Sequence, residues 1–171
     1  HLQRRRQRQM CIRDRFNGSR ISLWLFILFT GLMTSRSIVH FLFPEYAFHE
    51  VANFSVISGQ PDPMVLFYRL FSLWGLAQLI FCLVCWLVIC RYKALIPLMY
   101  LLWLVEWAVR AVFHTISVIH DVPSAVYTNE LAPGVSFAPL VVGLLVILFS
   151  HSLISGAGDR LWSNFKLWRL I

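Results

Sequence analysis

Four long apolar stretches joined by short polar links are the feature that most limits what this chain can fold into. They cover residues 21–43, 64–89, 94–119 and 135–154, and each supplies the roughly 20 mainly apolar residues that a membrane-spanning α-helix needs. Strands are excluded because lipid cannot satisfy their open backbone groups, and the stretches lack the alternation of a barrel strand. With 58% hydrophobic and 13% charged residues, the chain is also too apolar for a soluble domain. The sequence predicts an all-α integral membrane bundle of four transmembrane helices.

The first fifteen residues differ in character from the rest of the chain. They hold six of its fifteen basic residues, and residues 5–14, RRQRQMCIRD, resemble the translation of a sequencing adapter. We interpret residues 1–15 as disordered, non-native read-through, which leaves residues 16–171 as a single four-helix transmembrane domain. Removing six arginines and Asp14 lowers the net charge from +7 to +2, so no nucleic-acid partner is expected. The alternative is a genuine cytoplasmic arm that binds anionic lipid.

Basic residues beside the spans predict their orientation. Two loops, residues 44–63 and 120–134, contain acidic side chains but no lysine or arginine. The flanks that contain basic side chains all fall on the opposite side of a four-span arrangement: residue 20, residues 91–93 and residues 160–169. Both termini are therefore predicted to be cytoplasmic in a multi-pass protein of the cell membrane. Apolar residues at near-helical spacing between positions 46 and 57 also predict a short interfacial helix in the first outer loop.

Ionisable side chains interrupt the predicted spans, mostly at helical spacing. Glu106 is followed one and two turns later by basic side chains, and the first span repeats the i, i+4 pattern. With the termini inside, the basic members all fall in the outer half of the bilayer, near one carboxylate. Because charge in hydrocarbon is costly, we expect them to face the bundle interior. The candidate ligand-binding residues are Arg36, His40, Arg69, Glu106, Arg110 and His114.

The excess of arginine over carboxylate predicts a binding or accessory protein instead of an enzyme, with a site for an amphipathic or anionic ligand such as a lipid or quinone. It could serve a larger membrane complex or a homo-oligomer. The same side chains could instead fasten the helices together without a ligand. A second hypothesis is a b-type haem electron carrier that uses His40 and His114 as axial ligands. A third is a small transporter or transporter subunit, which helix-breaking residues inside the spans would favour.

Cys82 and Cys85 have the CxxC spacing of thiol oxidoreductases. They lie in the middle of an apolar run, however, and no native loop contains a cysteine with which they could exchange. We therefore interpret them as buried apolar side chains. The histidines and acidic residues match no compact metal-ligand motif, and no catalytic residue or metal site is predicted.

The layout of the spans and a few single residues resembles small DoxX-like inner-membrane proteins of bacteria. The resemblance rests on Arg69 near the start of the second span, the basic link Arg91-Tyr-Lys93, and Arg110 followed by Asp121-Val-Pro123-Ser124. It covers most of residues 16–171 as a pattern of spans. It implies a four-helix architecture and a bacterial inner-membrane location, but no mechanism, because the family is largely without assigned chemistry.

Overall fold

The structure is a computed structural model that describes residues 19–119 and 133–153, with the side chains of residues 114–119 outside the description. No strand occurs within these ranges, so the all-α prediction is confirmed for them. Helix α2 spans Arg20–Leu42, α3 Pro44–Tyr46, the π-helical turn η1 Ala47–Val51, α4 Met64–Arg91, the 3₁₀ turn η2 Lys93–Leu95, α5 Ile96–Ile119, α7 Pro133–Ser136 and α8 Ala138–Leu153. Three of the described helical segments are long and apolar enough to cross a membrane: α2, α4 and Lys93–Phe113.

The ends of α2 and α4 follow from capping groups and prolines in the sequence. The Ser19 hydroxyl accepts a hydrogen bond of 3.2 Å from the backbone N–H of Ile21, which caps the start of α2. The helix ends before Pro44, which disfavours helical geometry in the residue that precedes it. At the start of α4, Asp62 accepts a 2.9 Å hydrogen bond from the N–H of Met64. Both helices therefore lie within two residues of their predicted bounds.

The fourth predicted span, residues 135–154, is interrupted near its start. Its described part falls in α7 and α8, which are separated by a turn at Phe137. Pro139 has no backbone N–H to continue the helical ladder here, although the N–H of Phe137 still donates to the carbonyl of Pro133 over 3.0 Å. Helix α8 has 16 residues, which is about 24 Å at 1.5 Å per residue. It is thus a shorter apolar helix than the other three, and the fourth span stays a prediction.

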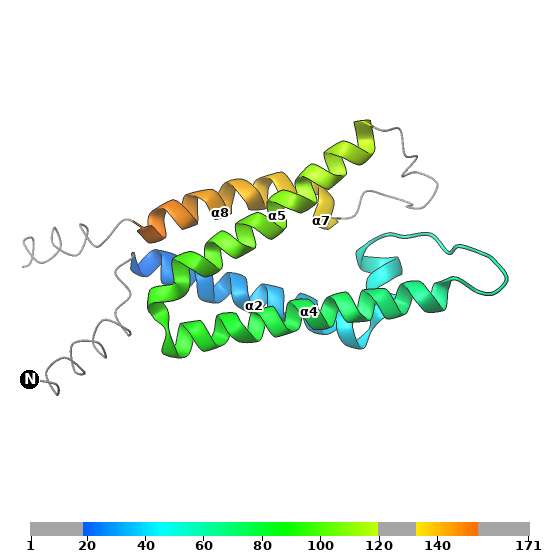
Figure 1. Cartoon of the computed structure of the whole chain (residues 1–171), viewed down its shortest axis with the longest axis horizontal. Helices are drawn as coiled ribbons and strands as arrows, with labels where there is room; N and C mark the ends of the chain where they lie inside the picture. The colour runs from blue at the N-terminus through cyan, green and yellow to red at the C-terminus, as the bar shows by residue number, and fades with distance from the viewer. Residues whose placement is uncertain (1–18, 120–132, 154–171) are drawn as a thin grey trace, which may run out of the picture.

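The helices pack as two pairs, α2 with α4 and α5 with α8 (Figure 1). The pairs lie close together near the link between α4 and α5 and separate toward the opposite end (Figure 1). Gly75 lets α2 and α4 approach closely, because a Cβ atom there would lie 2.6 Å from the backbone nitrogen of Phe41. The Ser72 hydroxyl also donates a 2.9 Å hydrogen bond to the carbonyl of Phe41. The first pair is therefore locked together beside this glycine.

An aromatic core joins the two pairs near the α4–α5 link. Tyr100 and Trp103 on α5 are fully buried. The Tyr100 hydroxyl donates a 2.7 Å hydrogen bond to the carbonyl of Ser22 on α2, and its ring lies 4.8 Å from that of Phe26. Trp103 contacts the ring of Phe29, with 5.3 Å between the centroids. These contacts fix the relative position of the pairs at one end of the molecule.

The polarity of α2 is the reverse of that of a helix in a water-soluble protein. Its fully buried residues include Ser22, Thr30 and Ser37. Its outward face presents large apolar side chains one turn apart: Trp24 is 69%, Leu28 70% and Leu32 65% exposed. Small polar residues at helix contacts and large apolar residues outside are typical of helices surrounded by lipid. The burial pattern therefore agrees with the membrane location that helix length indicates.

The predicted helix in the first outer loop is present in part, as α3 and η1. Phe48 in η1 is only 4% exposed. Its ring lies 4.7 Å from that of Phe54 and 5.4 Å from that of Phe71 on α4, measured between centroids. The loop therefore folds back over α4 and brings residues 51–54 beside the separated ends of the helix pairs.

Candidate functional site

A cavity of about 540 Å³ opens where the helix pairs separate. Helices α2, α4, α5 and α7 and the first outer loop all contribute to its wall. The lining is mainly aromatic and aliphatic, but it includes three ionisable side chains. The lining residues are Arg36, His40, Val51, Ala52, Phe54, Phe71, Trp74, Arg110, Phe113, Gly134 and Val135. A mostly apolar cavity with a few convergent polar groups is the usual form of a small-molecule site.

Two guanidinium groups in this cavity share the same pair of indole rings. Arg36 on α2 lies 5.4 Å from the ring centroid of Trp74 on α4 and 6.0 Å from that of Trp107 on α5. For Arg110 on α5 the corresponding distances are 4.8 and 5.2 Å. Such cation–π contacts are worth about 0.5–2 kcal/mol each, depending on how fully water is excluded. They hold two positive charges near each other without neutralising either.

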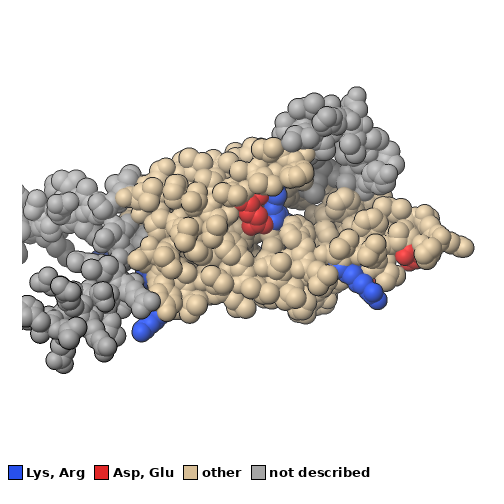
Figure 2. Space-filling model, viewed as in Figure 1, with Lys and Arg blue, Asp and Glu red and all other residues tan. Residues whose placement is uncertain are grey.

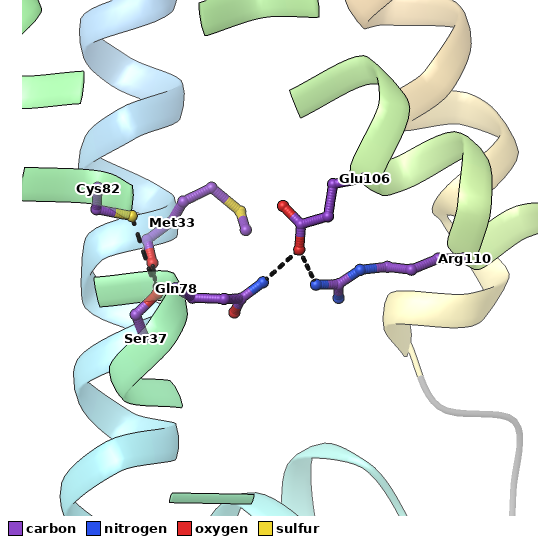
Figure 3. Close-up of polar contacts among 6 residues, drawn as sticks. All are labelled: Met33, Ser37, Gln78, Cys82, Glu106 and Arg110. Carbon is purple, nitrogen blue, oxygen red and sulfur yellow. Dashed lines mark hydrogen bonds and ion pairs between the residues drawn. The ribbon is translucent and has the colours of Figure 1, made fainter. Parts of the chain in front are cut away.

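A carboxylate neutralises only one of these charges. Glu106 and Arg110 lie one turn apart on α5 and form an ion pair. The same Glu106 oxygen accepts a 2.7 Å hydrogen bond from the side-chain amide of Gln78 on α4 (Figure 3). The ion pair on α5 is thus hydrogen-bonded to α4, which belongs to the other pair of helices. Gln78 was not predicted as a site residue, because nothing in the sequence distinguishes an uncharged residue of an ionic site from any other residue of an apolar run.

Arg36 has no such partner within the described part of the chain. Its Nη1 atom is buried and makes no hydrogen bond there, and the described residues contain one salt bridge, the pair between Glu106 and Arg110. Gly134 lies beside Arg36, and an added Cβ there would make an ordinary contact of 3.7 Å with Nη2. Buried donors are rarely left without an acceptor, because desolvation then goes uncompensated. Among the described residues that line the cavity, Arg36 is the one with a buried polar atom that lacks a hydrogen-bond partner.

His40 contributes an acceptor to the same wall. Its Nδ1 lies 2.8 Å from the carbonyl oxygen of Arg36, and because a carbonyl can only accept, Nδ1 is the protonated nitrogen of this bond. In a neutral ring, Nε2 then has a free lone pair. The ring is 1% exposed, and its centroid lies 5.2 Å from that of Phe71 and 5.3 Å from that of Trp74. The aromatic side chains therefore fix its orientation.

Two of the six predicted site residues do not join this arrangement in the described structure. Arg69 is exposed on α4 and does not line the cavity. The backbone of His114 belongs to α5, but its side chain lies outside the described residues. Pairing of His40 with His114 around a haem therefore stays a prediction. No group of three or more potential metal ligands occurs in the ranges that the structure describes.

Other sequence features fall into structural roles. Cys82 and Cys85 are free and fully buried, which agrees with their interpretation as apolar core residues. Cys82 contacts the hydroxyl of Ser37 across the α2–α4 interface, with 3.9 Å between sulfur and oxygen (Figure 3). Pro97 and Pro139 lie in the first turns of α5 and α8, where proline is tolerated. They do not give these helices the mid-span breaks that the transporter hypothesis would favour.

Charged side chains are sparse on the face of the molecule seen in Figure 2, where one acidic and one basic side chain meet in a recess. The fold and the site thus define a helical membrane protein with a mostly apolar cavity that contains a few ionisable side chains. Comparisons with models of protein families, with curated proteins and with solved structures found no match to this chain. The resemblance to DoxX-like proteins therefore stays a prediction.

Proposed function

We propose that this chain is a membrane protein that binds an amphipathic ligand, a lipid or a quinone, with its head group between Arg36 and Arg110. In this proposal the bundle crosses the bilayer four times, with both termini in the cytoplasm. The cavity then lies in the outer half of the membrane, because it sits toward the loop of residues 43–63 and away from the basic Arg91–Lys93 link. A bacterial inner-membrane location rests on the DoxX-like resemblance.

The observation that carries this proposal is the buried, unpaired Nη1 of Arg36 at the wall of a cavity of about 540 Å³. In a polar cluster that only fastens helices together, we would expect the charged donors to be paired within the protein. Among the described residues, Arg110 has an ion-pair partner and Arg36 has none. An oxygen-bearing ligand head group would supply the missing acceptor.

The rest of the wall suits an apolar ligand body. Phe54, Phe71 and Phe113 line the cavity together with aliphatic residues, so a hydrocarbon chain or isoprenoid could pack beside the polar groups. The volume falls in the range of about 300–1,000 Å³ that is usual for small-molecule sites. It would hold a head group and the first part of a tail, while the remainder of the tail extends among lipids.

Native mass spectrometry of the full chain, purified in mild detergent, tests this function. The comparison includes Arg36→Gln, which removes the unpaired charge, and Arg69→Gln, which removes an exposed arginine from the same half of the described bundle. We expect a co-purifying mass on the wild type and on Arg69→Gln, and its loss from Arg36→Gln. Ligand-free spectra from all three folded proteins would instead show that the cluster serves helix packing.

A further inference from the structure

We infer that the ligand head group bears a single negative charge, a carboxylate or a phosphodiester, and bridges Arg36 on α2 and Arg110 on α5. This inference rests on the proposed function, since it names the chemical class that the proposed cavity would take. It also assigns the ligand a structural role, because the two arginines belong to different helix pairs.

The charge balance of the cavity is the first argument. Within the described residues, Arg36 and Arg110 contribute two positive charges and Glu106 one negative charge. His40, 1% exposed beside these cations, adds no charge as a neutral ring. Among the described side chains, one positive charge is left in low-dielectric surroundings, where it is costly. A single negative charge balances it, whereas the neutral carbonyl of a quinone would satisfy the hydrogen bond and leave the charge.

The acidic side chains of the first outer loop lie away from the cavity of Arg36. Glu45 and Glu50 line a separate pocket together with His49 and Tyr68. Asp62 caps the first turn of α4. None of these carboxylates lines the cavity of Arg36. The compensating anion is thus not provided by this loop.

The geometry of the donors is the second argument. A guanidinium presents a planar fork of N–H groups that matches the oxygens of a carboxylate or phosphate. Nη1 of Arg36 has no partner in the described structure, while Nη2 of Arg110 is held by Glu106 (Figure 3). Both guanidiniums lie within 6.0 Å of the same two ring centroids and both line the cavity, so in this inference one oxygen of the anion meets each group. Glu106 and Gln78 would then fix Arg110 for this contact.

The test measures binding of three defined probes to the full chain in detergent: oleate, dioleoylphosphatidylglycerol and decylubiquinone. The first has a carboxylate, the second a phosphodiester and the third a neutral carbonyl head group. We expect one of the two anionic probes to bind at least tenfold more tightly than decylubiquinone, and the tighter of the two identifies the source of the anion. Equal or tighter binding of decylubiquinone would overturn the charge assignment and leave the proposed ligand site in place. Binding of none of the probes would contradict both.

Two substitutions shift the balance in opposite directions. Arg36→Gln leaves Arg110 and Glu106 balanced, so the preference for an anion over decylubiquinone should fall to about equal binding. Glu106→Gln leaves two uncompensated cations, and it should gain at least tenfold affinity for dioleoylphosphatidic acid, whose phosphate monoester can carry a second negative charge. Arg69→Gln serves as the control and should keep wild-type selectivity. Unchanged selectivity in both cavity variants, with their helical circular dichroism intact, would refute the bridging role of these charges.

Discussion

The side-chain amide of Gln78 on α4 donates a 2.7 Å hydrogen bond to the carboxylate of Glu106 on α5, and so joins the two helix pairs beside the cavity. This bond lies near the point where the aromatic core ends and the pairs begin to separate. It therefore couples the ionic part of the site to the packing of the bundle.

Replacing Gln78 by leucine should weaken the association of the helix pairs. The change removes the hydrogen bond to Glu106, and interhelical hydrogen bonds in membranes are worth about 0.6 to 1.7 kcal/mol. We expect the free energy of unfolding to fall by about 1 kcal/mol, measured by titration with a denaturing detergent. Ser35→Ala is a suitable control, since the exposed Ser35 hydroxyl donates within α2, to the carbonyl of Leu32. A Gln78→Leu protein as stable as the control would show that this bond contributes little.

Replacing Gly75 by alanine should separate α2 from α4. An added Cβ would lie 2.6 Å from the backbone nitrogen of Phe41, and backbone cannot move aside as a flexible side chain can. Overpacking of this kind costs about 1–3 kcal/mol, and the same detergent titration would detect it. Gly143→Ala is the matched control, because nothing lies within 4 Å of a Cβ placed there. If both alanine variants behave alike, the close approach of the two helices is not a determinant of stability.

Replacing Tyr100 by phenylalanine should loosen the closed end of the bundle. The ring would remain packed against Phe26, but the buried carbonyl of Ser22 would lose the 2.7 Å hydrogen bond from the hydroxyl. The carbonyl keeps its bond within α2, so the loss is that of one ordinary hydrogen bond, about 0.5–1.5 kcal/mol, and the thermal midpoint of the purified protein should fall. Tyr46→Phe, at a position that is exposed in the outer loop, should leave the midpoint unchanged. Equal midpoints for the two variants would contradict the importance of the Tyr100 bond.

Thiol labelling of Cys90 should report the proposed orientation. This side chain is exposed one residue before Arg91, whereas Cys82 and Cys85 are buried. In intact cells that produce a Cys11→Ser chain, a membrane-impermeant maleimide should not react, but it should label Cys90 once the cytoplasmic side is opened. Cys90→Ser should abolish the signal in both cases. Labelling of intact cells would place the α4–α5 link outside and reverse the proposed topology.

The bounds of α2 and α4 could be predicted because apolar length, Ser19 and the flanking prolines are all visible in the sequence. The turn at Phe137 was missed, although Pro139 marks a place where the helical ladder loses a donor. The apolar stretch predicted one helix over residues 135–154, whereas its described part is divided between α7 and α8.

The candidate site could be predicted only where charge marked it. Arg36 and Arg110 stood out as ionisable residues in apolar runs, and the structure places both at one cavity. Trp74 and Trp107 could not be told from lipid-facing tryptophans, because the face that turns inward depends on how the helices rotate and cross. The same ambiguity explains why the sequence predicts Arg69 as a site residue, although its side chain is exposed on α4.

The contact of Gly75 with the backbone of His40 and Phe41 also determines how the cavity can change shape. Arg36 lies one turn before this contact, and Trp74 is next to Gly75 in the sequence. The α2–α4 side of the cavity is therefore rigid, because the spacing of the two helices is set by direct contact between their backbones. On the other side of the cavity, α5 with Arg110 is joined to this pair by side-chain contacts, among them the hydrogen bond between Gln78 and Glu106. Head groups of different width would therefore be accommodated by movement of α5, while the spacing between α2 and α4 stays unchanged.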